Sequence, residues 1–277
     1  MNAAQITSGT ITSGTVGGQV EAAPLLKVDG LTKWYGHILG CRDVSFEMRP
    51  GEVLGIVGES GSGKTTLLNC VSGKLAPSAG SIQFATSRFG MTDIYALSEP
   101  DRRRMQREDW GFVHQNPRDG LRMRVSGGAN VAEPLMNLGS RHYGKMRQAT
   151  IDWLDRVELD TRRIDDRPAN FSGGMQQRIQ VARNLIHGPK LVFMDEPTGG
   201  LDVSVQARLL DLLRELVRDL KLAVIIVTHD MAVARLMADR LMVMKDGRVV
   251  ETGLTDQVLD DPQHPYSQVL VSSVLQI

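Results

Sequence analysis

A strand, a glycine-rich loop and a helix follow one another between residues 52 and 71, and this order limits the chain to few folds. The strand-like stretch 52–57 runs into the loop Gly58-Glu59-Ser60-Gly61-Ser62-Gly63-Lys64-Thr65, and a helical pattern continues to Val71. This is the context that a Walker A phosphate-binding loop requires. Glycines let backbone N–H groups and the helix N-terminus point at phosphate oxygens. Lys64 would neutralise the β and γ phosphates of ATP, the Thr65 hydroxyl would ligate Mg²⁺, and Thr66 would complete the nucleotide contacts.

The rest of the chain predicts an α/β fold around a largely parallel sheet. Short apolar runs at 191–194, 223–227 and 241–244 are typical of strands buried on both faces. Between 201 and 222, apolar residues at steps of three and four predict a helix that packs on this sheet through Val205, Leu209, Leu212, Leu213 and Leu216. Residues from about 91 to 170 are rich in charge and helix formers, so we expect an inserted, mostly helical subdomain there.

Two acidic residues and a histidine follow predicted strands. The run 191–194 ends in Asp195-Glu196, and His229 follows the strand that begins at Ala223. The carboxyl ends of parallel strands meet at one edge of a sheet, where α/β folds bind ligands. Asp195 would hold Mg²⁺ through its water shell, Glu196 would act as general base on the attacking water, and His229 would contact the γ-phosphate.

Composition excludes several other classes. The 277 residues carry 32 basic and 32 acidic side chains, so the net charge is zero and no nucleic acid is expected as partner. No run of about 20 apolar residues could cross a membrane and the start lacks a signal peptide, which predicts a soluble, cytoplasmic protein without direct membrane insertion. Cys41 and Cys70 are too few for a disulfide framework and are expected to be reduced structural thiols.

The first 24 residues look different from the rest. They contain the direct repeat Ile-Thr-Ser-Gly-Thr at 6–10 and 11–15 and few bulky side chains. Such a stretch buries too little apolar surface to offset the entropy of ordering it. We therefore expect a disordered tail over 1–24 and a folded domain over 25–277.

From about Leu25 to the C-terminus, the motifs and their order resemble the ATPase subunits of the ATP-binding cassette (ABC) family. In this resemblance Tyr35, or its neighbour Trp34, stacks on adenine. Gln115 is the Q-loop glutamine that touches Mg²⁺ and the attacking water, and Leu201-Asp202 is the D-loop that lies along a partner subunit. The resemblance implies a P-loop NTPase fold in which an antiparallel β subdomain and the inserted helical subdomain flank the mostly parallel sheet.

Phe171-Ser172-Gly173-Gly174-Met175 resembles the signature motif of the same family, and a helix is expected over 172–187. By this resemblance Ser172, Gly173, Gly174 and Asp202 contact the nucleotide bound to the opposite subunit of a dimer. Ser172 can cap the helix as well. Phenylalanine and methionine stand here where leucine and glutamine are common, and Gly199-Gly200 replaces a common Ser-Ala, so the rate of hydrolysis is less constrained than nucleotide binding.

The partner system is indicated by finer resemblance. The stretch Asp260-Asp261-Pro262-Gln263-His264-Pro265-Tyr266 is similar to the tail of oligopeptide and nickel importer ATPases, whereas segments 114–122, 126–130 and 171–178 resemble the ATP-binding subunit of the bacterial carbon–phosphorus lyase system. The leading hypothesis is therefore an ATPase that docks on the soluble lyase core during phosphonate breakdown. An importer motor and a non-hydrolysing, ATP-gated scaffold remain alternatives. The working pair is a homodimer or includes a related ABC subunit.

Arginines supply the expected docking surface. Arg118, Arg122 and Arg124 follow the Q-loop glutamine, where importer ATPases receive a helix of the membrane subunit, and Arg102, Arg103, Arg104 and Arg107 form a second group. Such a group is either a solvated helical face or a site that binds an acidic partner surface.

Overall fold

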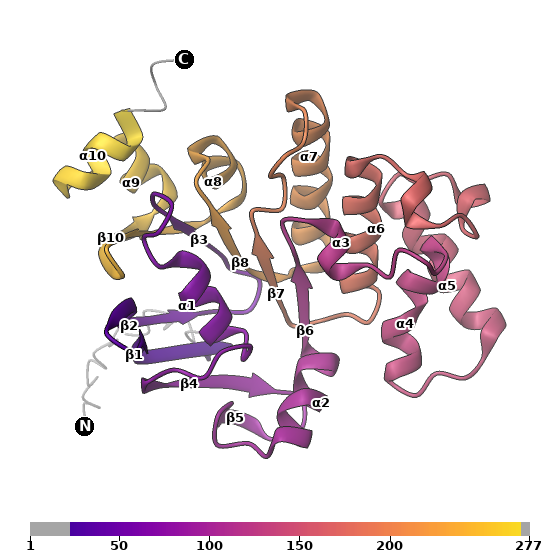
Figure 1. Ribbon diagram of the computed structural model, residues 1–277, viewed down its shortest axis with the longest axis horizontal. Helices are drawn as coiled ribbons and strands as arrows, with labels where there is room; N and C mark the ends of the chain where they lie inside the picture. The colour runs from indigo at the N-terminus through magenta and orange to yellow at the C-terminus, as the bar shows by residue number, and fades with distance from the viewer. Residues whose placement is uncertain (1–22, 273–277) are drawn as a thin grey trace, which may run out of the picture.

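The computed structural model describes residues 23–272, and these residues build two β-sheets with helices around them (Figure 1). The antiparallel sheet has the order β2-β1-β4-β5, from β1 (Leu26–Tyr35), β2 (Ile38–Met48), β4 (Ala79–Thr86) and β5 (Gly90–Asp93). The second sheet has the order β10-β9-β3-β8-β7-β6. Its strands are β3 (Val53–Val57), β6 (Trp110–Val113), β7 (Leu191–Asp195), β8 (Ala223–Thr228), β9 (Arg240–Lys245) and β10 (Arg248–Leu254). Five of the six run parallel, and β10 is antiparallel to β9, which confirms the predicted fold class.

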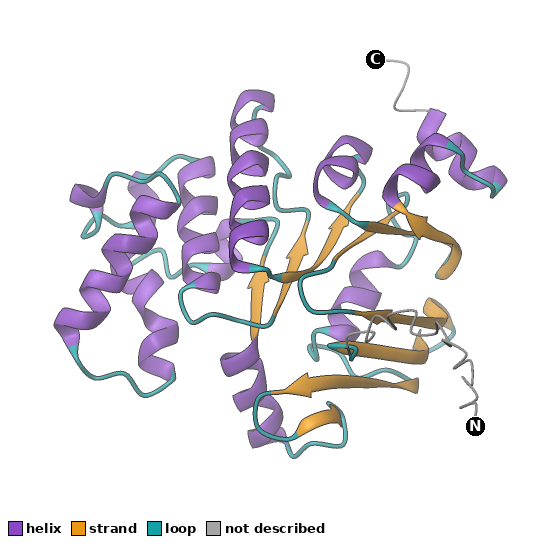
Figure 2. Cartoon of the chain, turned by 180° about the vertical axis from the view of Figure 1, so that it is seen from behind, coloured by secondary structure: helices purple, strands orange, loops and turns teal. Residues whose placement is uncertain are grey.

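Side chains on the parallel strands alternate between two cores. In β7, Leu191 and Phe193 pack toward helix α1 (Lys64–Val71) and the antiparallel sheet, while Val192 and Met194 pack toward the helices on the other face. This period of two is the geometry of a strand buried on both sides. The helices on that second face are α6 (Gly173–Leu185), α7 (Val203–Leu220) and α8 (Met231–Met237), and Figure 2 shows them beside the sheet.

Helix α7 confirms the apolar face expected within residues 201–222. Leu209, Leu212, Leu213 and Leu216 are buried in the core. Val205 is only half-buried, because it lies against the signature segment at Gly174 rather than against the sheet.

The range 91–170 contains more than helices. Helix α2 (Glu99–Asp109) leads into β6 at the edge of the parallel sheet, and the elements that follow stand apart from the sheet in Figure 1. These are α3 (Pro117–Gly120), α4 (Gly127–Asn137), α5 (Tyr143–Arg156), and the 3₁₀ turns Thr161–Arg163 and Pro168–Asn170. The helical insertion that we propose is therefore the part of the range beyond β6.

The chain ends are described in part. The expected disordered tail over 1–24 lies outside the described residues apart from Ala23 and Pro24, as do residues 273–277 of the expected domain. The backbone of Leu25 is already bonded to the sheet, because its N–H donates to the carbonyl oxygen of Met48. The last described helices are α9 (Thr255–Asp260) and α10 (Pro265–Ser272).

The structure bears on two expectations from composition, the state of the cysteines and the lack of a membrane-spanning segment. Cys41 on β2 and Cys70 on α1 are both free and fully buried, as expected for structural thiols. Among residues 23–272, none of the helices combines the length and apolar character needed to span a bilayer.

Candidate active site

The loop between β3 and α1 holds a lysine ammonium against its own backbone. Gly63 has a φ of 99°, and a Cβ at this position would lie 2.3 Å from the carbonyl oxygen of Gly40, so only glycine fits. Lys64 is 6% exposed, and its Nζ donates to the carbonyl oxygens of Gly58 and Glu59, both at 2.7 Å. Burial lowers the pKa of Lys64, although nearby carboxylates act in the opposite direction.

Three residues predicted for the site meet at the carboxyl edge of the parallel strands. Glu196 follows β7, and its carboxylate accepts a hydrogen bond from Gln115 Nε2 at 3.1 Å. Its other oxygen lies 2.9 Å from His229 Nδ1. Glu196 has a φ of 43°, a left-handed backbone that is uncommon outside glycine, and such residues cluster at functional sites. The turn at Glu196 directs its carboxylate between the ends of β6 and β8.

Asp195 lies beside this carboxylate in a half-buried position. Its pKa is raised by burial first and by the charge of Glu196 second, while Lys74 and Lys64 act against the shift. A divalent cation would relieve this repulsion between adjacent carboxylates. Thr65, an exposed residue at the start of α1, lines the same cavity as Glu196, and its hydroxyl and the Gln115 carboxamide are oxygen donors of the kind that Mg²⁺ prefers.

A cavity of about 700 Å³ opens over the loop. Its lining joins loop residues 58–61 and 63–66 to Glu196, His229 and the end of β1. Tyr35 lies at this end of β1, 46% exposed, and its hydroxyl is 3.4 Å from Thr66 Oγ1. The neighbouring Trp34, also exposed, is not among the lining residues. The geometry therefore favours Tyr35 over Trp34 as the residue that stacks on a base.

The signature residues lie elsewhere on the molecule. Ser172 is the N-cap of α6, and its Oγ accepts from the N–H of Met175 at 3.4 Å. Figure 1 shows α6 and α1 on opposite sides of β7 and β8, and Ser172, Gly173 and Gly174 are absent from the lining of the cavity. Asp202 is exposed at the start of α7, next to Val203, which is 85% exposed.

The unusual signature residues have a common neighbour. Phe171 is buried, and the guanidinium of Arg163 lies 4.1 Å from its ring centroid. The same side chain places Nη1 4.0 Å from Met175 Sδ, and its Nη2 donates to the carbonyl oxygen of Asn170. Phenylalanine and methionine therefore provide a cation–π and a sulfur contact to one arginine of the inserted helices.

Gly199 has a local reason to be glycine. A Cβ there would lie 3.0 Å from Gln115 Nε2, so a larger residue would press on the amide that reaches Glu196. The replacement of the common serine by glycine leaves Gln115 room.

One residue at the loop escaped the sequence reasoning. Tyr266 on α10 accepts a hydrogen bond from the N–H of Glu59 at 3.0 Å, and Leu270 of the same helix lines the cavity. The closing motif 260–266 was noticeable in the sequence, but nothing in it points to a contact 207 positions earlier in the chain.

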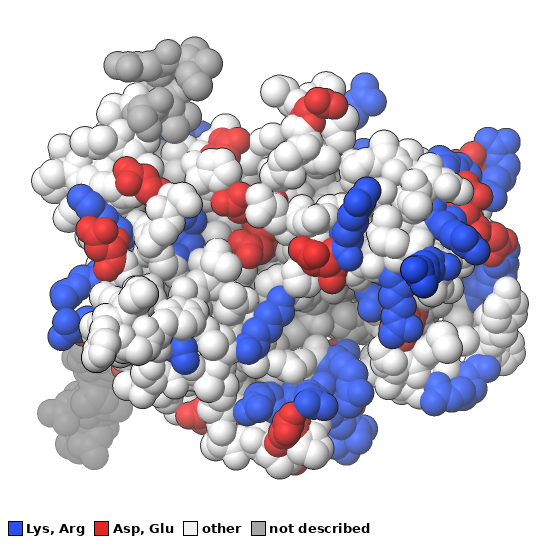
Figure 3. Space-filling model, in the orientation of Figure 1, with Lys and Arg blue, Asp and Glu red and all other residues white. Residues whose placement is uncertain are grey.

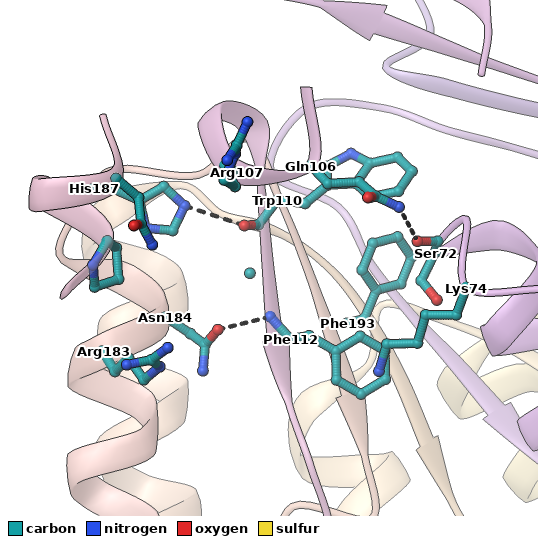
Figure 4. Close-up of a pocket in the computed structure, with 13 residues that line it drawn as sticks. Ser72, Lys74, Gln106, Arg107, Trp110, Phe112, Arg183, Asn184, His187 and Phe193 are labelled. Atoms are coloured by element: carbon teal, nitrogen blue, oxygen red, sulfur yellow. Dashed lines mark hydrogen bonds between the residues drawn. The ribbon is translucent and has the colours of Figure 1, made fainter. Parts of the chain in front are cut away.

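A second cavity of about 290 Å³ lies between α2, β6 and α6 (Figure 4). Phe112, Trp110 and Phe193 give it aromatic walls, and its lining also includes Arg107 and Arg183, the latter paired with Glu133. The Nζ of Lys74 lies over the ring of Phe112.

The two sheets, the phosphate loop and the polar residues at the strand ends together define a P-loop ATPase. Residues 41–199 match the sequence profile described as ABC transporter, and the chain belongs to this ATP-binding cassette family. It is similar, at 64% identity over 91% of this chain and 98% of the relative, to the putative phosphonates utilization ATP-binding protein PhnK of Escherichia coli K12. It is 36% identical to a putative peptide import ATP-binding protein of Brucella abortus, over 92% of this chain and 78% of the relative.

Solved structures confirm the fold. A dimeric, post-hydrolysis structure of the ATP-binding cassette MJ0796 bound to ADP and Pi superposes with a TM-score of 0.73 at 29% identity, over 83% of this chain and 98% of that one. The cbiO1 subunit of Clostridium perfringens, part of the transporter complex cbiONQ, gives a TM-score of 0.74 at 27% identity, over 92% of this chain and 96% of that one. The chain is accordingly an ATP-hydrolysing cassette.

Proposed function

We propose that this chain is the Mg²⁺-dependent ATPase subunit of a bacterial carbon–phosphorus lyase system, that it dimerises around ATP, and that it docks on the soluble lyase core in the cytoplasm during phosphonate breakdown. The observation that carries the proposal is the 64% identity over 98% of the E. coli phosphonates utilization protein. The putative peptide import relatives are 36–37% identical, and the chain covers 78% of their length.

Within the site, Glu196 is the proposed general base. Gln115 and His229 hold its two carboxylate oxygens, so the carboxylate is oriented before water arrives. Loop residues 58–66 and Lys64 bind the phosphates, and Tyr35 stacks on adenine. Thr65, Gln115 and, through water, Asp195 would hold Mg²⁺, which neutralises phosphate charge when bound. Glu196 then accepts a proton from the water that attacks the γ-phosphorus.

The role of Glu196 is tested by Glu196→Gln, which keeps the shape of the side chain but removes the base. We expect ATP hydrolysis to fall at least about 100-fold while ATP binding persists and an ATP-bound dimer accumulates. Phosphate release and size-exclusion chromatography with ATP measure the two effects. Persistent phosphate release by the variant would show that another group is the base.

The proposed docking surface is the arginine-rich segment after Gln115 together with the arginines of α2, of which Arg103 and Arg104 pair with glutamates of the same helix. In Figure 3, Lys and Arg side chains gather over α2 and over the helices beyond β6. Arg118 and Arg124 are exposed, whereas Arg122 Nη2 is paired with Glu133 at 2.6 Å. The second cavity borders this face through Arg107 and offers aromatic walls to a partner side chain. An acidic surface of the lyase core matches this chemistry.

Charge reversal separates docking from catalysis. The double variant Arg118→Glu/Arg124→Glu should lose co-purification with the lyase subunits and keep its basal ATPase activity. Arg218→Glu on α7, which is also exposed, is the control and should behave as wild type. Capture of an integral membrane permease by the wild-type chain would instead support the importer hypothesis, and absence of phosphate release with all partners present would support the scaffold.

A further inference from the structure

The segment after β10 is fixed to the body of the protein through its backbone. The carboxylate of Glu251 on β10 accepts hydrogen bonds from the N–H groups of Gln263 and His264, at 2.8 and 3.0 Å. His264 Nδ1 in turn accepts from the N–H of Tyr266 at 3.1 Å. These bonds set the position at which α10 begins.

Tyr266 is the side chain through which α10 reaches the phosphate loop. Its ring is buried, 7% exposed, and the Nζ of Lys245 lies 4.8 Å from the ring centroid. Its hydroxyl oxygen accepts the 3.0 Å hydrogen bond from the N–H of Glu59, the second residue of the loop. Leu270, one helical turn further on the same face of α10, lines the cavity above the loop.

The backbone of Glu59 is therefore held from two sides. Lys64 donates hydrogen bonds to the carbonyl oxygens of Glu59 and Gly58, while the N–H of Glu59 donates to the hydroxyl of Tyr266. A bound triphosphate would attract the Lys64 ammonium away from these carbonyls, because the phosphates carry more negative charge. The bond to Tyr266 does not depend on Lys64, so it can fix the entrance of the loop in both states.

We propose that Tyr266 is a positioning residue for ATP: helix α10 braces the phosphate loop through the tyrosine hydroxyl and keeps its amides oriented for phosphate. The inference rests on the proposed role of residues 58–66 in phosphate binding. A preorganised loop pays less ordering entropy on binding, so the brace acts on nucleotide affinity more than on the chemical step.

The test is Tyr266→Phe in the full chain, which removes only the hydroxyl. We expect the KM for ATP and the Kd for ADP to rise about three- to ten-fold, with kcat close to wild type and a melting temperature within a few degrees of wild type. Tyr143→Phe is the matched control, because the Tyr143 side chain is 70% exposed and its hydroxyl contacts Arg147 on α5. That variant should keep wild-type KM, Kd and kcat.

Hydrogen exchange gives a second readout that does not depend on turnover. In the nucleotide-free protein, the amide of Glu59 should exchange faster in Tyr266→Phe than in wild type, while amides in β7 keep their protection. Unchanged exchange at Glu59 together with unchanged KM would overturn the brace. Lys64→Ala is measured in parallel: if it retains full ATP affinity, the assignment of the loop as phosphate site fails, which is a different result from failure of the brace.

Discussion

Gly173 and Gly174 are adjacent in the signature segment, but their surroundings differ. A Cβ on Gly173 would have an ordinary contact, 3.5 Å from Leu201 Cδ2. A Cβ on Gly174 would lie 2.4 Å from Val205 Cγ1 on α7, far closer than carbon atoms approach. Gly174 is therefore required for the packing of α6 on α7, whereas Gly173 is free to serve the ligand contact that we propose.

Alanine at each position separates the two roles. Gly174→Ala should lower the free energy of unfolding by about 1–3 kcal/mol through overpacking, and Val205→Ala in the same chain should restore part of it. Gly173→Ala should keep the wild-type free energy of unfolding but hydrolyse ATP more slowly. Urea denaturation measures the free energy of unfolding, and phosphate release measures hydrolysis. Equal stability of the two single variants would contradict this difference.

At the scale of elements, α6 is joined to the end of β6 by buried amides. Gln180 is fully buried; its Oε1 accepts from the N–H of His114 at 2.6 Å, and its Nε2 donates to the carbonyl oxygen of the same residue at 3.1 Å. Gln177 Nε2 donates to that carbonyl as well. Gln115 follows directly, so the signature helix sets the backbone from which the Q-loop side chain reaches Glu196.

Gln180→Met keeps the volume of this side chain and removes its hydrogen bonds. Leaving the buried N–H and C=O of His114 with fewer partners should cost about 1–3 kcal/mol of unfolding free energy. ATPase activity should fall as well, because the position of Gln115 loosens. Gln148→Met on α5 is the control, since the Gln148 side chain is exposed and donates a hydrogen bond to Asp152 of the same helix. Denaturant titration that finds the two variants equally stable would refute the role of Gln180.

At the scale of the whole molecule, the separation of the phosphate loop from the signature segment predicts shared sites in a dimer. A chain with Lys64→Ala loses its own phosphate site, and a chain with Ser172→Glu loses the signature that it offers to its partner. Each should be inactive alone. A mixed dimer of the two retains one intact site, so an equal mixture should recover about a quarter of wild-type activity if the sites act independently.

In the mixing experiment, phosphate release is measured across a series of ratios of the Lys64→Ala and Ser172→Glu chains. Activity should peak near equal amounts and vanish at either end. Two copies of Ser172→Glu mixed at different concentrations provide the control, because no ratio of identical chains creates an intact site. A mixture that stays inactive while both variants still form dimers with ATP would contradict a signature that acts across the interface.

Much of the fold and part of the site were predictable from local sequence. The phosphate loop is eight consecutive residues whose function lies mostly in their backbone, and the strands that deliver Asp195, Glu196 and His229 are short apolar runs. Parallel strands then bring their carboxyl ends to one edge, so the meeting of Glu196 with His229 follows from strand order.

Other features depend on which elements pack together. The contact between Tyr266 and Glu59, the fit of Gly174 against Val205, and the pairing of Arg122 with Glu133 join residues from different elements. No periodicity or motif encodes them, because each depends on the relative placement of two elements.

By itself, the sequence determined the motifs of this protein: a phosphate loop, an acidic strand end and a signature segment, each of which is a run of neighbouring residues. Only the tertiary structure decided how these parts are held. In it, helix α10 contacts the phosphate loop, and the backbone before Gln115 is hydrogen-bonded to buried glutamines of α6. Gly174, but not Gly173, packs tightly against α7. The physical reason is that local conformation depends on nearby residues, whereas packing depends on surfaces that meet only when the chain has folded.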